Sequence, residues 1–230
     1  MQHRSKKIKK SFFIILVVLI VLSGGSAIYL GNYYHSVDVE KYMNSSSEVS
    51  VEKFDKGWFF DGAGEEKALI FYPGAKVATE AYAPLMYQLA ESGIDCFLVD
   101  MPFHMAFFGM NRAEEIMQEY NYEAWYLGGH SLGGAMAANF AADYVEDHTD
   151  GIRGLLLLAA YPTKDLSTSD MSVVTVYGSE DGVLNMDKIV AGRELMPQDY
   201  KEVCIEGGNH AQFGSYGTQT VSYTHLRAHE

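Results

Sequence analysis

The pentapeptide Gly129-His130-Ser131-Leu132-Gly133 constrains the fold of this chain more than any other stretch of its sequence. The apolar run at 124–127 before it has the composition of a buried strand, and the alanine-rich run at 135–142 after it has that of a helix. Glycines on both sides of Ser131 predict a turn so tight that larger side chains would collide with the neighbouring strand or helix. Such a turn raises the serine hydroxyl at a helix N-terminus, where backbone N–H groups can meet an oxyanion.

Short apolar runs alternate with stretches of helical spacing over most of the chain, and an antiparallel pair at 49–55 and 58–61 precedes them. We expect strands at 68–72, 96–99, 124–127, 154–160, 173–177 and 201–205, and helices at 80–92, 111–120, 132–146 and 185–195. Continuous apolar strands that alternate with helices predict an α/β fold, in which helices flank both faces of a mostly parallel central sheet.

Two further motifs follow the pentapeptide, each after a predicted strand. The first is Val176-Tyr177-Gly178-Ser179-Glu180-Asp181, and the second is Glu206-Gly207-Gly208-Asn209-His210. With these three motifs in this order, the sequence resembles the α/β-hydrolase family over about residues 49–219. The resemblance implies a catalytic triad of Ser131, Asp181 and His210 at the carboxyl ends of strands, with Glu180 as the alternative acid.

The resemblance also implies a role for each of these residues. Ser131 would attack a carbonyl carbon, His210 would accept and return the proton, and Asp181 would orient and stabilise the imidazole. The oxyanion would bind the backbone N–H groups of Leu132 and Ala75. The family's usual His-Gly is replaced here by Pro73-Gly74, which changes little because only backbone atoms are needed.

The aromatic loop at 101–110 should border the mouth of this site. Phe103, His104 and Phe107 would either form an apolar wall for an acyl or aryl group or pack under an ordinary surface loop. The family often inserts a lid after the strand expected at 154–160, but the segment 163–171 is too short for one, so we expect an open site. Because neither H-E-x-x-H nor paired cysteine spacing occurs, the sequence predicts no metal and no cofactor.

The N-terminal segment 1–31 begins with five basic residues among its first ten, and residues 12–30 carry no charge. A helix of nineteen uncharged residues just spans a bilayer, and the basic flank would stay in the cytoplasm. A cleavable signal peptide is the alternative, since Gly25-Ser26-Ala27 resembles a cleavage site. Both readings place the domain at 49–220 beyond the membrane, either anchored or secreted, and make the polar segment 32–48 a linker.

The C-terminal segment 221–230 reads Val-Ser-Tyr-Thr-His-Leu-Arg-Ala-His-Glu and matches one reading frame of a transposase adapter used in sequencing libraries. We therefore expect a non-native tail after a chain cut short near Gln219, and leave it out of fold reasoning. The family's closing helix, which follows the histidine loop, would then be missing. The expected α/β-hydrolase fold is C-terminally truncated in this sense.

Charge and cysteines bound the partners and the redox chemistry. Without its two terminal segments the chain has 11 basic and 29 acidic residues, which disfavours nucleic acids and anionic lipids as partners. Cys96 and Cys204 lie in apolar strand-like runs, so they could form a disulfide outside the cytoplasm or remain two buried thiols. We favour the thiols, because the expected fold separates the two strands.

From the resemblance we expect a serine hydrolase that cleaves small-molecule carboxylic esters through an acyl-enzyme. Acyl transfer to another alcohol, or amide or thioester cleavage, would use the same triad. A different class of function, a binding protein that keeps the fold without catalysis, remains open, because fold alone does not define function.

Overall fold

The computed structural model describes residues 15, 16, 18, 25, 31–148 and 151–217. Met1–Tyr33 and Tyr34–Glu230 form two separate compact units, and the sheet belongs to the second. Within the described residues, no helix combines the length and apolarity needed to cross a membrane. Most of the expected anchor or signal segment at 12–30, and all of the tail at 221–230, lie outside the described residues.

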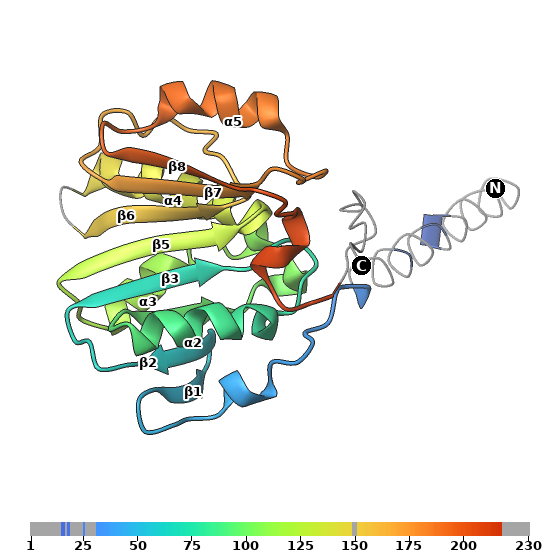
Figure 1. The fold of residues 1–230 in the computed structure, drawn as a ribbon, viewed down its shortest axis with the longest axis vertical. Helices are drawn as coiled ribbons and strands as arrows, with labels where there is room; N and C mark the ends of the chain where they lie inside the picture. The colour runs from blue at the N-terminus through green and yellow to red at the C-terminus, as the bar shows by residue number, and fades with distance from the viewer. Residues whose placement is uncertain (1–14, 17, 19–24, 26–30, 149–150, 218–230) are drawn as a thin grey trace, which may run out of the picture. The chain divides into compact units, whose positions relative to one another are not determined.

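Eight strands form one sheet in the order β1-β2-β4-β3-β5-β6-β7-β8 (Figure 1). They are β1 (Ser50–Phe54), β2 (Gly57–Asp61), β3 (Lys67–Tyr72), β4 (Asp95–Val99), β5 (Ala124–His130), β6 (Ile152–Leu158), β7 (Ser172–Gly178) and β8 (Tyr200–Ile205). β1 and β2 form the expected antiparallel pair, β2 is antiparallel to β4, and every pairing from β4 to β8 is parallel. The predicted mostly parallel α/β sheet is therefore confirmed.

Helices cover both faces of the sheet (Figure 1). α2 (Ala83–Glu91) lies on one face, whereas α3 (Arg112–Glu119) and α4 (Leu132–Asp147) lie on the other, and α5 (Met186–Gly192) lies beyond β8. Short 3-10 helices are found at Glu40–Met43, Thr79–Tyr82, Pro102–His104, Ala106–Phe108, Arg193–Leu195 and His210–Phe213. The expected helix at 80–92 is thus a 3-10 turn followed by α2.

The apolar core is divided by the sheet, because successive side chains of a strand point to opposite faces. In β3, Ala68, Ile70 and Tyr72 pack with α3 and α4, while Leu69 and Phe71 pack with α2. All five are buried, which explains the continuous apolar run in the sequence.

Part of the expected linker at 32–48 packs on the sheet domain. Tyr34 pairs with Val77 in an isolated parallel bridge, and Val37 donates a backbone hydrogen bond of 2.8 Å to Ser215. Val39 is also buried. The compact unit therefore begins near Tyr34 rather than at residue 49.

Both cysteines are free, but only Cys96 is buried. The expectation of two buried thiols is wrong for Cys204, which is exposed on the outermost strand β8. Its neighbours Val203 and Ile205 are 45% exposed. An apolar strand is buried only where something covers it, and no described helix covers this part of β8.

Candidate active site

Ser131 sits at the junction of β5 and α4 in a strained backbone conformation. Its φ is 53° and its ψ is −122°, a region that residues other than glycine rarely occupy. Its N–H donates a 2.9 Å hydrogen bond to the carbonyl of Leu158, at the end of β6. Strain of this kind persists only where the surrounding structure enforces it, and it is concentrated at functional sites.

Close packing around the turn explains its glycines. A β-carbon on Gly133 would lie 2.1 Å from the carbonyl oxygen of Tyr72, and one on Gly129 would lie 2.6 Å from backbone atoms of Gly133 and Gly134. Backbone atoms cannot retreat as the end of a flexible side chain can. The sequence expectation that larger side chains would collide with the strand or helix is confirmed at both positions.

Asp181 and His210 meet across two loops at the carboxyl ends of β7 and β8. The carboxylate oxygen Oδ2 of Asp181 lies 2.8 Å from Nδ1 of His210. The loops touch through glycines: a β-carbon on Gly178 would lie 2.1 Å from the carbonyl oxygen of Gly208. Glu180, the alternative acid, donates its backbone N–H to the same Gly208 carbonyl at 2.8 Å.

The Asp181 carboxylate is fully hydrogen-bonded in a buried setting. Its side chain is 0% exposed and that of His210 is 4% exposed. The Oδ1 atom of Asp181 accepts hydrogen bonds from the backbone N–H groups of Val183 and Leu184 at 2.9 and 2.8 Å. Burial alone would raise the pKa of Asp181, but hydrogen bonds from His210 and the backbone outweigh it and hold that pKa below the usual value. A charged Asp181 is thus held against His210.

His210 is placed beside the strained turn through His130, the residue before Ser131. The two imidazole rings lie with their centroids 4.6 Å apart. Because Nδ1 of His210 is taken by Asp181, Nε2 is the nitrogen left for a serine hydroxyl. No hydrogen bond joins the Ser131 hydroxyl to His210 in the described ranges, and such contacts often form only when substrate is bound.

The backbone N–H groups of Leu132 and Ala75 have no acceptor among the described residues. That of Leu132 begins α4 and belongs to the first turn, where N–H groups have no intrahelical partner. That of Ala75 has no acceptor among the described residues, whereas the next two N–H groups, of Lys76 and Val77, bond to the carbonyls of His104 and Gly74. These are the two donors that the sequence suggested for an oxyanion.

The loop after β4 carries an exposed aromatic cluster formed by Phe103, Phe107 and Phe108. Their exposed fractions are 57%, 48% and 52%, and Phe108 contacts both other rings, with centroids 5.5 and 4.2 Å away. Sequence reasoning singled out Phe103 and Phe107 and missed Phe108. His104 is half-buried, and burial lowers the pKa of its imidazole. None of the three rings is therefore a buried core residue.

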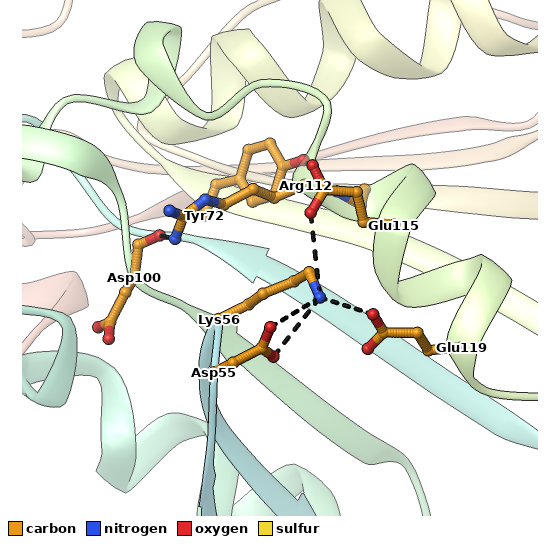
Figure 2. A network of polar contacts seen from close by, with 8 residues as sticks. Asp55, Lys56, Tyr72, Asp100, Arg112, Glu115 and Glu119 are labelled. Atoms are coloured by element: carbon orange, nitrogen blue, oxygen red, sulfur yellow. Dashed lines mark hydrogen bonds and ion pairs between the residues drawn. The ribbon is translucent and has the colours of Figure 1, made fainter.

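Polar contacts anchor both ends of this loop (Figure 2). The buried hydroxyl of Tyr72 donates to the carbonyl of Met110 at 2.6 Å and accepts the N–H of Ala113 at 3.0 Å. At the other end, the guanidinium of Arg112 donates to the carbonyl of Asp100, whose N–H donates to the carbonyl of Lys56 at 2.8 Å. The aromatic cluster is thus presented from a fixed frame.

Lys56, in the turn between β1 and β2, forms ion pairs with α3 (Figure 2). Its ammonium lies 2.7 Å from Glu119, 3.1 Å from Asp55 and 3.9 Å from Glu115. Its hydrogen bond to Glu119 is the largest of the influences that raise the pKa of this lysine. Lys56 is therefore a structural cation that ties the β1–β2 turn to α3.

Two buried residues near the site were not predicted as functional: His130 and Tyr82. His130 was visible inside the pentapeptide, but nothing in the sequence showed that its ring would pack on His210. Tyr82 had no motif around it. For metals, the described ranges hold no group of three His, Cys, Asp or Glu side chains placed to bind one.

Residues 68–229 match the sequence pattern of the alpha/beta hydrolase family. The chain belongs to this family. The match contains all three motifs, and the protein is therefore a hydrolase by family. A search of the curated proteins found no match to this alpha/beta hydrolase.

Solved structures with a similar fold include several lipases and esterases. The alpha/beta hydrolase resembles a monoglyceride lipase from Saccharomyces cerevisiae with a TM-score of 0.54 and 13% identity, over 79% of this chain and 92% of that one. A carboxyl esterase from Tuber melanosporum gives a TM-score of 0.58 and 13% identity over 77% and 81%. A carboxylesterase from Bacillus subtilis gives 0.53 and 9% over 75% and 89%. At such low identity these likenesses establish the fold alone.

Proposed function

We propose that this alpha/beta hydrolase cleaves carboxylic esters of small molecules through an acyl-enzyme on Ser131. The observation that carries the proposal is the buried Asp181–His210 pair, 2.8 Å apart, whose imidazole packs against the residue preceding a strained serine. A serine hydroxyl is a weak nucleophile until a neighbouring base takes its proton. An imidazole oriented by a buried carboxylate supplies that base.

The proposed reaction proceeds in two halves. In the first, Ser131 Oγ bonds to the ester carbonyl carbon while its proton passes to His210 Nε2. The oxyanion that forms accepts hydrogen bonds from the N–H groups of Leu132 and Ala75. The C–O bond to the alcohol then breaks, and His210 returns the proton to the departing oxygen. In the second half, water repeats these steps on the acyl-enzyme and releases the acid.

An open site favours small soluble esters over fats at an oil–water interface. Residues 159–171, which connect β6 to β7 where a lid would be inserted, contain no helix. The three exposed rings of the aromatic cluster would instead form an apolar wall for an acyl or aryl group. Acyl transfer to another alcohol is the alternative outcome of the same acyl-enzyme, and it would appear as ester formation when a second alcohol is supplied.

The test is hydrolysis of p-nitrophenyl acetate by the full chain and by Ser131→Ala. We expect the variant to remain folded and to lose activity by about a million-fold in kcat, as nucleophile removal does in other triads. Ser92→Ala, at the end of α2, is the matched control and should keep full activity. Wild-type turnover by a folded Ser131→Ala variant would refute the nucleophile. A chain that hydrolyses no ester in a broad library would instead favour a binding protein without catalysis.

We also propose that the N-terminal segment holds the domain outside the cytoplasm, as an anchor or before signal cleavage. The five basic residues before an uncharged stretch support this orientation. The test is protease treatment of intact cells that express the full chain. Digestion of the domain is expected, and protection until the cells are lysed would contradict the proposal.

A further inference from the structure

A buried hydroxyl joins the oxyanion loop to the nucleophile turn. The Tyr82 hydroxyl accepts the backbone N–H of Gly74 at 3.1 Å and lies 2.8 Å from Nδ1 of His130. Tyr82 is 0% exposed and His130 is 1% exposed. Both contacts are therefore shielded from water, where a hydrogen bond holds its geometry more strongly than at the surface.

The protonation states of Tyr82 and His130 bear on the direction of these hydrogen bonds. Burial raises the pKa of Tyr82 well above its usual value, so its hydroxyl keeps its proton. Burial, together with the neighbouring His210, lowers the pKa of His130 to about 3, so this ring is neutral near pH 7. The tyrosine oxygen accepts the Gly74 N–H, and in the His130 tautomer that carries its proton on Nε2 the tyrosine hydroxyl donates to Nδ1. The series of hydrogen bonds runs from Gly74 through Tyr82 to His130.

These hydrogen bonds connect the residue before an oxyanion donor with the residue before the nucleophile. Gly74 precedes Ala75, whose N–H is one oxyanion donor, and His130 precedes Ser131. The packing is tight: a β-carbon on Gly74 would lie 2.7 Å from Nδ1 of His130 and 2.8 Å from the Tyr82 hydroxyl. The His130 ring also packs on His210, with the ring centroids 4.6 Å apart. One buried pair therefore touches the oxyanion loop, the nucleophile turn and the base.

The pair is not what stability alone would select. Nε2 of His130 is buried and has no partner of full hydrogen-bond geometry among the described residues, although the backbone of His210 interacts with this ring. A buried polar group with an incomplete hydrogen bond costs free energy that an apolar side chain of similar size would avoid. Local rules are broken in this way mainly where a residue serves the site rather than the fold.

We propose that Tyr82 and His130 are positioning residues that hold the Gly74–Ala75 backbone in register with Ser131. The inference rests on the ester hydrolysis proposed above. It assigns neither residue a bond to the substrate. Their contribution is to fix the oxyanion donor relative to the serine, because a small misplacement of reacting groups costs a large factor in rate.

The experiment compares Tyr82→Phe and His130→Leu in the full chain with Tyr87→Phe, a control tyrosine inside α2, the helix that follows Tyr82. Two quantities are measured: kcat and KM for p-nitrophenyl acetate, and amide hydrogen exchange of the segment from Gly74 to Ala78. In both variants we expect kcat to fall by about ten- to a hundred-fold, with KM changed by less than about two-fold. Exchange at Gly74 should speed up, and Tyr87→Phe should change neither quantity.

Two further variants separate positioning from simple loss of packing. His130→Asn places an amide near the position of Nδ1 and should recover part of the kcat that His130→Leu loses. The double variant Tyr82→Phe/His130→Leu should be no slower than the slower single variant, because both changes break one chain of contacts. Losses that multiply, or no recovery with Asn, would overturn the proposal.

The exchange measurement keeps this inference separate from the proposed function. If wild-type chain hydrolyses no ester, the proposed function fails, and faster exchange at Gly74 in Tyr82→Phe would still show that the pair holds the loop. If the wild type is active and Tyr82→Phe leaves either the exchange or kcat unchanged, the positioning role is wrong while the triad stands.

Discussion

The carboxylate of Asp181 lies 2.8 Å from Nδ1 of His210, and it comes from a different loop at the same edge of the sheet. The contact is buried on both sides, and two backbone N–H groups hold the second carboxylate oxygen. The aspartate therefore has no freedom to turn away. It fixes which nitrogen of His210 faces the neighbouring serine turn.

Asp181→Asn should lower kcat by about ten-thousand-fold while the protein stays folded. The amide can occupy the same space, but it favours the wrong imidazole tautomer. It also lacks the negative charge that stabilises the imidazolium. The measurement is the kcat for p-nitrophenyl acetate beside a thermal melt. The neighbouring Glu180→Gln is the control and should retain wild-type turnover. The reverse ranking of the two variants would move the role of the acid to Glu180.

The free energy of unfolding should decrease at acid pH because His130 is held neutral in the folded protein. Its pKa is lowered by burial and by His210 to about 3, against about 6.5 in an unfolded chain. Between these values the unfolded state binds more protons, so the free energy of unfolding decreases as the pH falls below 6.5. The slope from this residue is about 1.4 kcal/mol per pH unit. Above pH 6.5 its stabilising contribution is complete.

The check is urea unfolding of wild type, His130→Asn and His148→Asn between pH 7 and pH 4.5. His148 is exposed on the far end of α4, whereas His104 and the carboxylates are common to all three. We expect a shallower pH dependence in His130→Asn than in the other two proteins. Parallel curves for all three would show that His130 is not held neutral in the folded state.

Tyr72→Phe should destabilise the protein by about 1–3 kcal/mol, because it leaves the Met110 carbonyl and the Ala113 N–H without their buried partner. Tyr216→Phe is the matched comparison. The Tyr216 hydroxyl is buried with no partner among the described residues, so its removal should be neutral or slightly stabilising. Chemical denaturation of the two variants measures both values, and equal losses would contradict this account of the loop.

Phe107→Ala should raise KM for aryl and medium-chain acyl esters more than for acetate esters. The ring is about half exposed on an anchored loop, so its loss removes apolar contact with the ligand without opening a core cavity. The melting temperature should therefore stay unchanged. Val203→Ala, on the exposed part of β8, is the control for the loss of an exposed apolar group. An equal change in KM for all esters would remove the cluster from the acyl or aryl site.

The sequence alone predicted the sheet and the tight turn at Ser131, because apolar runs specify buried parallel strands and glycines specify close packing. The meeting of Asp181 with His210 was implied instead by the resemblance to the hydrolase family, whose site residues lie at the carboxyl ends of such strands. The role of the glycines at 129 and 133 could be predicted because few backbone conformations make so tight a turn, and they leave no room for a β-carbon. Element ends shifted by a few residues, as at β5, which continues to His130.

The positions of Tyr82, His130 and Phe108 could not be read from the sequence in the same way. Tyr82 reaches His130 across 48 residues, and neither periodicity nor turn chemistry encodes such a distant contact. Phe108 looked like its neighbours in an apolar loop, and its exposure depends on how Tyr72 and Arg112 hold that loop. Cys204 looked buried because its strand is apolar, whereas burial depends on what covers the strand.

The most direct measurement is mass spectrometry of the full chain after reaction with a fluorophosphonate probe. We expect one adduct in the wild type, on the peptide that contains Ser131. We expect no adduct in Ser131→Ala and much slower labelling in His210→Ala, because the base activates the hydroxyl. Labelling that persists in Ser131→Ala, or a wild-type chain that takes no label, would show that Ser131 is not the activated nucleophile.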